Sequence, residues 1–411
     1  MEENDAAFIL GKGGQTKQKI SRVCGAVIDL NERDHTISIS GTRYQREKAK
    51  DYISWIKQQR VGGVEIDIDA GRDDMSVIKV PADCIAFVMG RGGQTLRSME
   101  GEWGTLMFFA KGVGGGDDSG SEMLMIFGTL RARRGAEMKV MSAIEHKLPG
   151  TFIQGGELVM QPRIRGDEHP DGWEVDTLQL EGDEFSYALG AGGSTRRKLA
   201  AASGCVLEYV GRVACFTGYK RDRRRARDYL KWLLMQRQGN VEVDYEDRED
   251  VITMTIPSQS VGFVTGHRGE ALRRVEQDSS TFCFINAGAE RGSDETLLIF
   301  SHDERNCKRA KSFVRDMLED HSRMSRRGDD RQRHEEDSRG GRDGRGRYDD
   351  RRGGGYDDRR GYDDRRGYDD RRGYDDRRDR YDDRRGYDDR RRDERHDDRR
   401  RDERHDDRRR D

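Results

Sequence analysis

The chain has 411 residues, of which 38% are charged and 32% hydrophobic, a composition too polar for one continuous core. Its formal net charge is −2 at pH 7, which excludes overall attraction to a polyanion and leaves nucleic-acid binding to local patches. Residues 322–411 contain 33 Arg, no Lys and 30 Asp plus Glu, a net charge of about +3 that leaves about −5 for residues 1–321. Because aliphatic residues nearly vanish after 321, we expect the globular part to end there.

The first segment, residues 1–60, has an apolar run, the glycine-rich turn GKGG at 11–14 and then a basic helix. Only MEENDAAF precedes its turn, where the third repeat has WEVDTLQLEGDEF, so a first strand is expected to be missing. Such a unit is either truncated or borrows a sheet edge from a neighbour, since an exposed edge is a pairing liability.

The second segment, residues 61–148, contains the strand SVIKVP and the turn GRGG at 90–93, with GVGGGDDSGS at 112–121 as a loop between its last two strands. Residues 149–172 are predicted to be a linker. The third segment, residues 173–239, has the turn GAGG at 190–193 and a tight strand pair, LEYVG and RVACFTG. These two segments therefore follow the order strand, helix, glycine turn, helix, strand, strand, helix.

The fourth segment, residues 240–321, shows this order most clearly. VITMTI at 251–256 alternates as a strand, Pro257 opens a short helix to Val264, and the turn GHRG at 266–269 follows. A second helix runs to about Gln277, strands are expected near 281–286 and 295–300, and a closing helix is expected over about 303–319.

The four segments form a duplicated pair. Gly11 recurs as Gly190, Trp55 as Trp232, Val64 as Val241, Pro81 as Pro257 and Gly90 as Gly266, at offsets between 176 and 179. WIKQQRVGGVEIDID and WLLMQRQGNVEVDYE show that the junction inside each pair is repeated too. This predicts that the two modules of a pair pack against each other in a fixed way.

The glycine turn suits a ligand with a phosphate backbone. Glycine lets another backbone approach closely and exposes amide N–H groups, while the helix that follows points its positive end at the same place. The turns follow helices rather than strands and no G-x-x-x-x-G-K-[ST] is present, which argues against a nucleotide phosphate loop.

The Gly-x-x-Gly turn between two short helices, the downstream strand pair and the closing helix resemble the type I KH domain over roughly residues 1–320. The array resembles multi-KH RNA-binding proteins such as the poly(C)-binding proteins and vigilin. The resemblance implies an α+β fold of four tandem type I KH domains (β-α-α-β-β-α), followed by a disordered tail over 322–411.

In that family the turn clamps the backbone of about four nucleotides while the bases lie on an apolar groove. Carried over, the RNA-binding clamp residues are Gly11, Lys12, Gly13 and Gly14; Gly90, Arg91, Gly92 and Gly93; Gly190, Ala191, Gly192 and Gly193; and Gly266, His267, Arg268 and Gly269.

The position three residues after each turn is usually aliphatic in the family, and Leu96 and Leu272 fit this pattern. Lys17 and Arg196 stand there in the first and third segments. They are hypothesised to make an additional phosphate contact; the alternative is that both side chains point into solvent. Because Ala191 leaves the third turn without a basic residue, the third and fourth modules are the ones expected to be inactive, if any are.

The tail repeats GYDDRR from Tyr356 to Arg378 and has almost nothing to bury, so disorder is expected. Arginine beside glycine and tyrosine suggests contacts with bases or with similar tails of other RNA-binding proteins. YKRDRRRAR at 219–227 is interpreted as a solvated helix face, with a nuclear import signal as the alternative. The six cysteines show no paired spacing and are expected to be buried thiols.

The predicted function is sequence-selective binding of single-stranded RNA, with a role in post-transcriptional regulation of messenger RNA. Two alternatives stay open: binding of single-stranded DNA in transcription, and a scaffold whose KH folds bind proteins. No catalytic or metal-binding pattern occurs, so no enzyme activity and no cofactor are expected. No apolar run is long enough to span a membrane and the N-terminus does not resemble a signal peptide, so a soluble protein of the nucleus or cytoplasm is expected.

Overall fold

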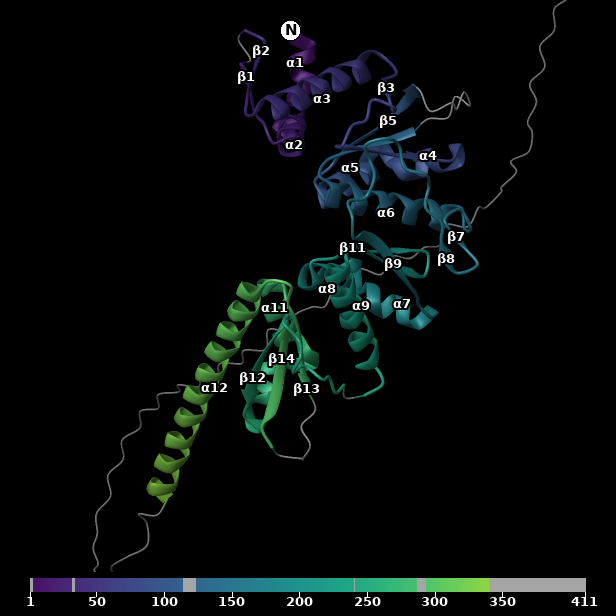
Figure 1. Ribbon diagram of the computed structural model, residues 1–411. Coiled ribbons are helices and arrows are strands. Elements are labelled where there is room, and N and C mark those ends of the chain that lie inside the picture. Colours follow the sequence, from purple (N-terminus) through teal and green to yellow (C-terminus); the bar gives the residue numbers. More distant parts are fainter. Residues whose placement is uncertain (1–2, 32–33, 114–122, 240, 287–292, 340–411) are drawn as a thin grey trace, which may run out of the picture. The chain divides into compact units, whose positions relative to one another are not determined.

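The structure is a computed structural model that describes residues 3–31, 34–113, 123–239, 241–286 and 293–339 (Figure 1). Four sheet-bearing units follow one another along residues 3–339. In each unit a glycine turn joins two helices, and a hairpin and a longer closing helix follow.

The first unit has a two-stranded sheet, β1 with β2. Before the turn, its described residues form helix α1 rather than a strand. Its elements are α1 (Glu3–Leu10), η1 (Lys12–Gly14), α2 (Gln15–Cys24), β1 (Val27–Asn31), β2 (Thr36–Ser40) and α3 (Arg43–Val61).

The second unit has a four-stranded sheet of order β3-β5-β6-β4. Strand β3 comes from the junction after α3 and pairs with β5 in parallel. The elements of this unit are β3 (Glu65–Asp67), β4 (Met75–Lys79), α4 (Ala82–Met89), η2 (Arg91–Gly93), α5 (Gln94–Trp103), β5 (Leu106–Val113), β6 (Met123–Phe127) and α6 (Leu130–Lys147). The predicted loop at 112–121 lies largely outside the described residues.

The third unit matches the expected order and has the sheet β10-β11-β9. Ahead of it, the predicted linker contains a short hairpin of β7 (Ile153–Gln154) and β8 (Glu157–Leu158). The unit itself consists of β9 (Trp173–Gln179), α7 (Gly182–Leu189), η3 (Ala191–Gly193), α8 (Ser194–Ser203), β10 (Val206–Val210), β11 (Val213–Tyr219) and α9 (Lys220–Met235).

The fourth unit has the sheet β12-β14-β13. It consists of β12 (Val251–Ile256), η4 (Ser258–Ser260), α10 (Val261–Thr265), η5 (His267–Gly269), α11 (Glu270–Ser279), β13 (Phe282–Asn286), β14 (Glu295–Phe300) and α12 (Glu304–Arg339). The closing helix was predicted to end near residue 319, but α12 continues to Arg339. The start of the tail at residue 322 stays a prediction. Ion pairs four residues apart, such as Glu319 with Arg323, support a helix that has few apolar residues. The predicted disorder of residues 340–411 lies outside the described residues.

In three of the four units, the sheet is covered on both faces. Each unit packs its own helices on one face, and the closing helix of the unit before it covers the other. Phe127 of β6 lies against Trp55 of α3, and Phe300 of β14 lies against Trp232 of α9, with ring centroids 4.9 and 5.0 Å apart. Because both faces are covered, every residue of β6 and β10 is buried. No earlier unit covers β1, and buried or half-buried residues alternate with exposed residues along this strand.

A buried polar cluster is repeated inside the two pairs. The hydroxyl of Tyr52 donates a hydrogen bond to the Asp74 carboxylate at 2.8 Å. Arg72 donates two hydrogen bonds to the same carboxylate, and the Arg72 guanidinium lies 5.1 Å from the Trp55 ring. The second pair repeats these contacts at equivalent positions, which are Tyr229, Asp250, Arg248 and Trp232. The same contacts at both junctions support the prediction that the modules of a pair pack in one fixed way.

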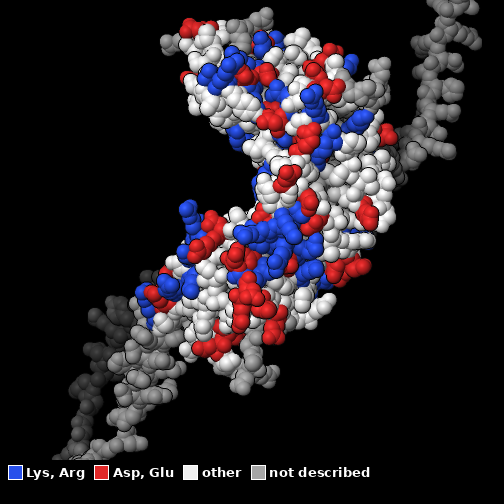
Figure 2. Space-filling model, in the orientation of Figure 1, with Lys and Arg blue, Asp and Glu red and all other residues white. Residues whose placement is uncertain are grey.

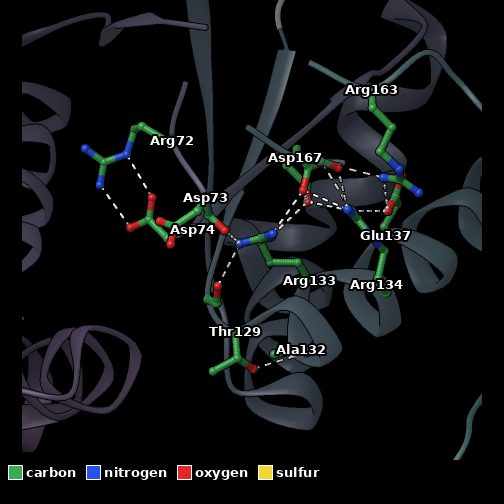
Figure 3. A network of polar contacts seen from close by, with 12 residues as sticks. Arg72, Asp73, Asp74, Thr129, Ala132, Arg133, Arg134, Glu137, Arg163 and Asp167 are labelled. Atoms are coloured by element: carbon green, nitrogen blue, oxygen red, sulfur yellow. Dashed lines mark hydrogen bonds and ion pairs between the residues drawn. The ribbon is translucent and has the colours of Figure 1, made fainter. Parts of the chain in front are cut away.

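Residues 149–172, predicted to be a linker, are packed against the second unit (Figure 3). The side chain of Gln161 exchanges hydrogen bonds with the backbone of Lys79, and Asp167 is 1% exposed. The Asp167 carboxylate accepts hydrogen bonds from the buried guanidinium groups of Arg133 and Arg134 on α6. The segment is therefore part of the packed second unit, which its hydrogen bonds to Lys79, Arg133 and Arg134 show.

His169, in the same segment, predicts a pH dependence of stability. Its pKa is lowered from the ordinary value to about 4, because burial and then the positive charges of Arg163 and Arg134 disfavour the imidazolium, although Asp167 opposes them. The unfolded chain therefore binds a proton that the folded chain does not between about pH 6.5 and pH 4. We expect the stability of the second unit to fall as the pH drops through this window.

This pH dependence can be measured by hydrogen exchange of α6 at several pH values. In His169→Gln, which cannot titrate, the loss of protection between pH 6.5 and pH 4 should be smaller than in the wild type. An identical pH profile for the variant would contradict the role of His169.

Candidate nucleic-acid interface

The four glycine turns share one backbone conformation. The first turn residue has φ between 68° and 70° in all four, and the last has φ between 76° and 78°. The third residue also has a positive φ, from 50° to 60°, and in the fourth turn that residue is Arg268, a strained position for a side chain with a Cβ atom. The four turns are therefore equivalent in backbone conformation despite their different sequences.

The first and third turn residues have different surroundings. A Cβ atom on Gly11 would lie 2.2 Å from Oγ1 of Thr16, so the first glycine is required by packing inside the unit. A Cβ atom on Gly13 would meet nothing within 4 Å, and the same is true of Gly92 and Gly192. The space above the middle of the turn is therefore open to a ligand.

The turns also present hydrogen-bond donors. The first and last amides donate within the unit, as in the bonds from Gly11 N to Ala7 O and from Gly14 N to Gly11 O. The amides of the two residues between them take part in neither bond. Arg97 reaches back from α5 to the carbonyl of Gly92 at 2.6 Å, and Arg197 does the same to Gly192 at 2.7 Å. An exposed guanidinium thus lies beside the second and third turns.

The side chains three residues after the turns separate into two kinds. Leu96 and Leu272 are 8% and 9% exposed and line grooves beside the turns of the second and fourth units. The hypothesis that Arg196 contacts phosphate was wrong, because this side chain is 2% exposed and ion-paired with Glu208 and with Glu102 of the second unit. Arg196 therefore joins the second and third units instead of facing a ligand.

Lys17 stays a prediction as a phosphate contact. Its side chain is 27% exposed and its Nζ lies 3.8 Å from an exposed carboxylate, that of Asp29, a weak ion pair that a phosphate could replace. If Lys17 neutralises one phosphate, Lys17→Leu should lower the slope of log K against log salt for single-stranded RNA by about 0.7. Titrations of the full chain at several salt concentrations would measure this, and an unchanged slope would contradict the contact.

An exposed aromatic residue that we did not single out from the sequence lies three positions before each turn. Phe8, Phe87, Tyr187 and Phe263 are 42, 40, 42 and 36% exposed. The constant spacing from the first glycine was visible in the sequence. However, each aromatic residue lies within a short apolar run, and such a run does not indicate which of its residues is exposed.

Basic residues gather over α8 and α9 in Figure 2. The stretch YKRDRRRAR opens α9, as predicted, but only part of it is solvated. Arg221 and Arg224 expose 73% and 78% of their side chains, while Arg223 is buried and ion-paired with Glu174. A groove beside these residues is lined by Arg221, Arg224, Arg225 and Arg248 together with Asp247, Glu249 and Asp250. This surface supplies a local positive patch, although acidic residues border it.

Three other predictions concern cysteines, metals and membranes. All six cysteines are buried free thiols, as predicted. Within the described ranges, no group of three or more His, Cys, Asp or Glu residues is arranged to hold a metal ion. No described helix combines the length and the apolarity that crossing a membrane requires.

Comparison with protein families gives a KH-domain match over residues 2–54, 75–142 and 251–316. These segments coincide with the first, second and fourth units. The third unit, residues 173–239, has the same order of elements but lies outside the matched segments.

Relatives of this chain include far upstream element-binding protein 1 of rat and human. The rat and human proteins are 23% and 22% identical to this chain over 254 residues, which is 58% of this chain and 37% of each relative. The alignment thus spans well under half the length of these relatives. The finer resemblance to poly(C)-binding proteins and vigilin stays a prediction.

Among solved structures, Dim2p of Pyrococcus horikoshii OT3 aligns with 39% of this chain and 90% of its own, at 17% identity and a TM-score of 0.20. A complex of a/eIF2alpha, aDim2p and rRNA from the same organism aligns at 18% identity, over 39% of this chain and 84% of its own, also with a TM-score of 0.20.

Proposed function

Because the chain is a multi-KH-domain protein, we propose that it binds single-stranded RNA selectively and acts in post-transcriptional regulation of messenger RNA. The observation that carries this proposal is the repeated turn. All four turns have the same positive-φ geometry, and the next helix begins directly after each last glycine. In KH domains a turn of this kind clamps the nucleotide backbone.

The surroundings of the turns favour a single strand. Lys12, Arg91, His267 and Arg268 are exposed at the turns, and the apolar side chains of Leu96 and Leu272 line the grooves beside them. A positive rim beside an apolar floor suits a phosphate backbone whose bases are unpaired.

The repetition of modules has a consequence for affinity. A single KH module contacts few nucleotides and should bind weakly. Fixed packing inside each pair holds two modules at a high effective concentration along one strand. Selectivity should therefore require a ligand long enough to reach more than one module.

Binding of single-stranded DNA is the second candidate. The relatives of this chain are named for binding a far upstream element, so a role on an element of this kind is the alternative to messenger RNA. The turn grips the backbone, whereas RNA is distinguished from DNA only where a side chain or backbone group reaches the 2′-hydroxyl.

The test is selection from a randomised single-stranded RNA pool by the full chain, with a DNA pool of the same sequences in parallel. Enrichment of short motifs from RNA, with weaker retention of the same motifs as DNA, supports the proposal. Equal or tighter DNA binding favours the second candidate. Absence of enrichment from both pools contradicts nucleic-acid binding and favours a protein-binding scaffold.

A further inference from the structure

The groove of the second unit is walled by the first unit. The second unit supplies Gly92, Leu96 and Met107, and the first unit supplies Phe8 and Lys12, to one groove of about 780 Å³. The turns of both units border this groove. It is therefore a feature of the pair and is incomplete in either unit alone.

The second pair builds the same groove from equivalent positions. Tyr187 replaces Phe8, Leu272 replaces Leu96, and Cys283 replaces Met107, in a groove of about 450 Å³. Because the duplication separates these residues by 176 to 179 positions, two independent copies of the sequence have kept the same composite arrangement.

An ion pair fixes the two walls of each groove. Nζ of Lys19 lies 2.8 Å from the Glu100 carboxylate, which also accepts the backbone N–H of Met107 at 2.8 Å. In the second pair, Lys198 lies 2.8 Å from Glu276, and Glu276 accepts the N–H of Cys283 at 2.9 Å. Each glutamate is at most 3% exposed, so the contact between the units is buried at the bottom of the groove.

The aromatic residues before the turns fall into two classes. In the second and fourth units they stack on a histidine of their own closing helix: Phe87 on His146 and Phe263 on His321, with centroids 6.1 and 4.7 Å apart. In the first and third units, Phe8 and Tyr187 instead line the grooves of the units that follow.

We propose that Phe8 and Tyr187 stack on nucleobases of a single-stranded RNA that lies in the groove of the next unit. The pair, rather than the single KH unit, is then the binding unit. The lining of the groove indicates this ligand, because it combines an aromatic wall and an apolar floor with exposed cations at the rim. The cations are Lys12 and Arg97 in the first pair and Arg273 in the second. Stacking surfaces beside positive charge fit unpaired bases on a polyanion. This inference rests on the proposed function.

The test compares Phe8→Ala and Tyr187→Ala with Phe87→Ala and Phe263→Ala in the full chain. Affinity is measured for the RNA selected by the wild type. Loss of one stacked base should weaken binding about 5- to 150-fold for Phe8→Ala or Tyr187→Ala, if the selected RNA fills that pair, and should leave the two control variants within a factor of about two. Phe8→Trp should retain binding, because it keeps an aromatic face.

Three outcomes separate the inference from the proposed function. If all four alanine variants bind like the wild type, or if the controls lose as much affinity as Phe8→Ala and Tyr187→Ala, the stacking role is overturned while RNA binding stands. If the wild type itself binds no RNA, the proposed function fails first. Photo-crosslinking with 5-bromouridine RNA gives an independent readout, and crosslinks at Phe8 or Tyr187, absent from Phe87 and Phe263, are expected.

Discussion

Binding of single-stranded RNA should fall roughly 100-fold or more when the middle residues of the first two turns, Lys12, Gly13, Arg91 and Gly92, are all changed to aspartate. A negative charge placed against a phosphate costs several kcal/mol, and two positive charges are lost as well. The measurement is the affinity of the full chain for its selected RNA, before and after the change.

The variant should still fold, which is what makes it informative. Gly13 and Gly92 have φ values of 60° and 55°, a region that Asp and Asn tolerate better than most residues. A Cβ atom at either position meets nothing within 4 Å. Gly11 and Gly90 are left unchanged because their Cβ atoms would clash with Thr16 and Thr95.

Asparagine at the same four positions is the matched control. It has the shape and backbone preference of aspartate without the charge, so it should lose only the two basic contacts and bind more tightly than the aspartate variant. A folded aspartate variant that binds like the wild type would show that these turns do not contact the ligand.

The order of elements could be predicted because it depends on local signals. Alternation in VITMTI and the glycine turns at fixed spacing determine where strands and helices begin. The structure places β12 at Val251–Ile256 and η5 at His267–Gly269, as expected from these signals. The duplicated junction likewise predicted fixed packing, because the same apolar and aromatic residues recur at both sites.

The role of Arg196 could not be predicted, because arginine on an amphipathic helix is usually exposed. Its burial depends on Glu208 of a neighbouring strand and on Glu102, which is remote in sequence and belongs to another unit. The pKa of Glu208 is raised to about 7 because burial outweighs the nearby positive charges of Arg196 and Lys139. Neither the partners nor the burial leaves a periodic signal in the sequence.

The packing of segment 149–172 could not be predicted for a similar reason. It contains glycine, proline and charged residues, a composition typical of a connection between domains. Its structural role depends on Asp167, whose carboxylate meets two arginines of α6 that also look like surface residues in the sequence (Figure 3). A buried charge with partners about 33 positions away can be recognised only once the fold brings them together.

Asp167→Ala should destabilise the second unit by about 3–5 kcal/mol, because it removes one partner of a buried ion-pair network and leaves the buried guanidinium of Arg133 without a carboxylate. The side chains of Arg133 and Arg134 are 2% and 0% exposed, and Nη2 of Arg134 lies 2.7 Å from the Asp167 carboxylate. Glu137 would then remain as the ion-pair partner of Arg134 and Arg163, while Arg133 would lose its ion pair. The loss of stability is measured by hydrogen exchange of α6 and β4. A local measurement is needed because a chain with several units does not unfold in one two-state step.

Glu168→Ala is the control, because Glu168 is the exposed neighbour of Asp167 and its removal should change stability by no more than about 0.5 kcal/mol. The loss of stability in Asp167→Asn should lie between those of Asp167→Ala and Glu168→Ala, since the amide oxygen still accepts hydrogen bonds but carries no charge. If Asp167→Ala exchanges like Glu168→Ala, the network does not hold the segment. If Asp167→Ala lowers the stability of the second unit alone, RNA binding through the second pair should persist. Tyr187 and Leu272 line a groove that is built from the third and fourth units.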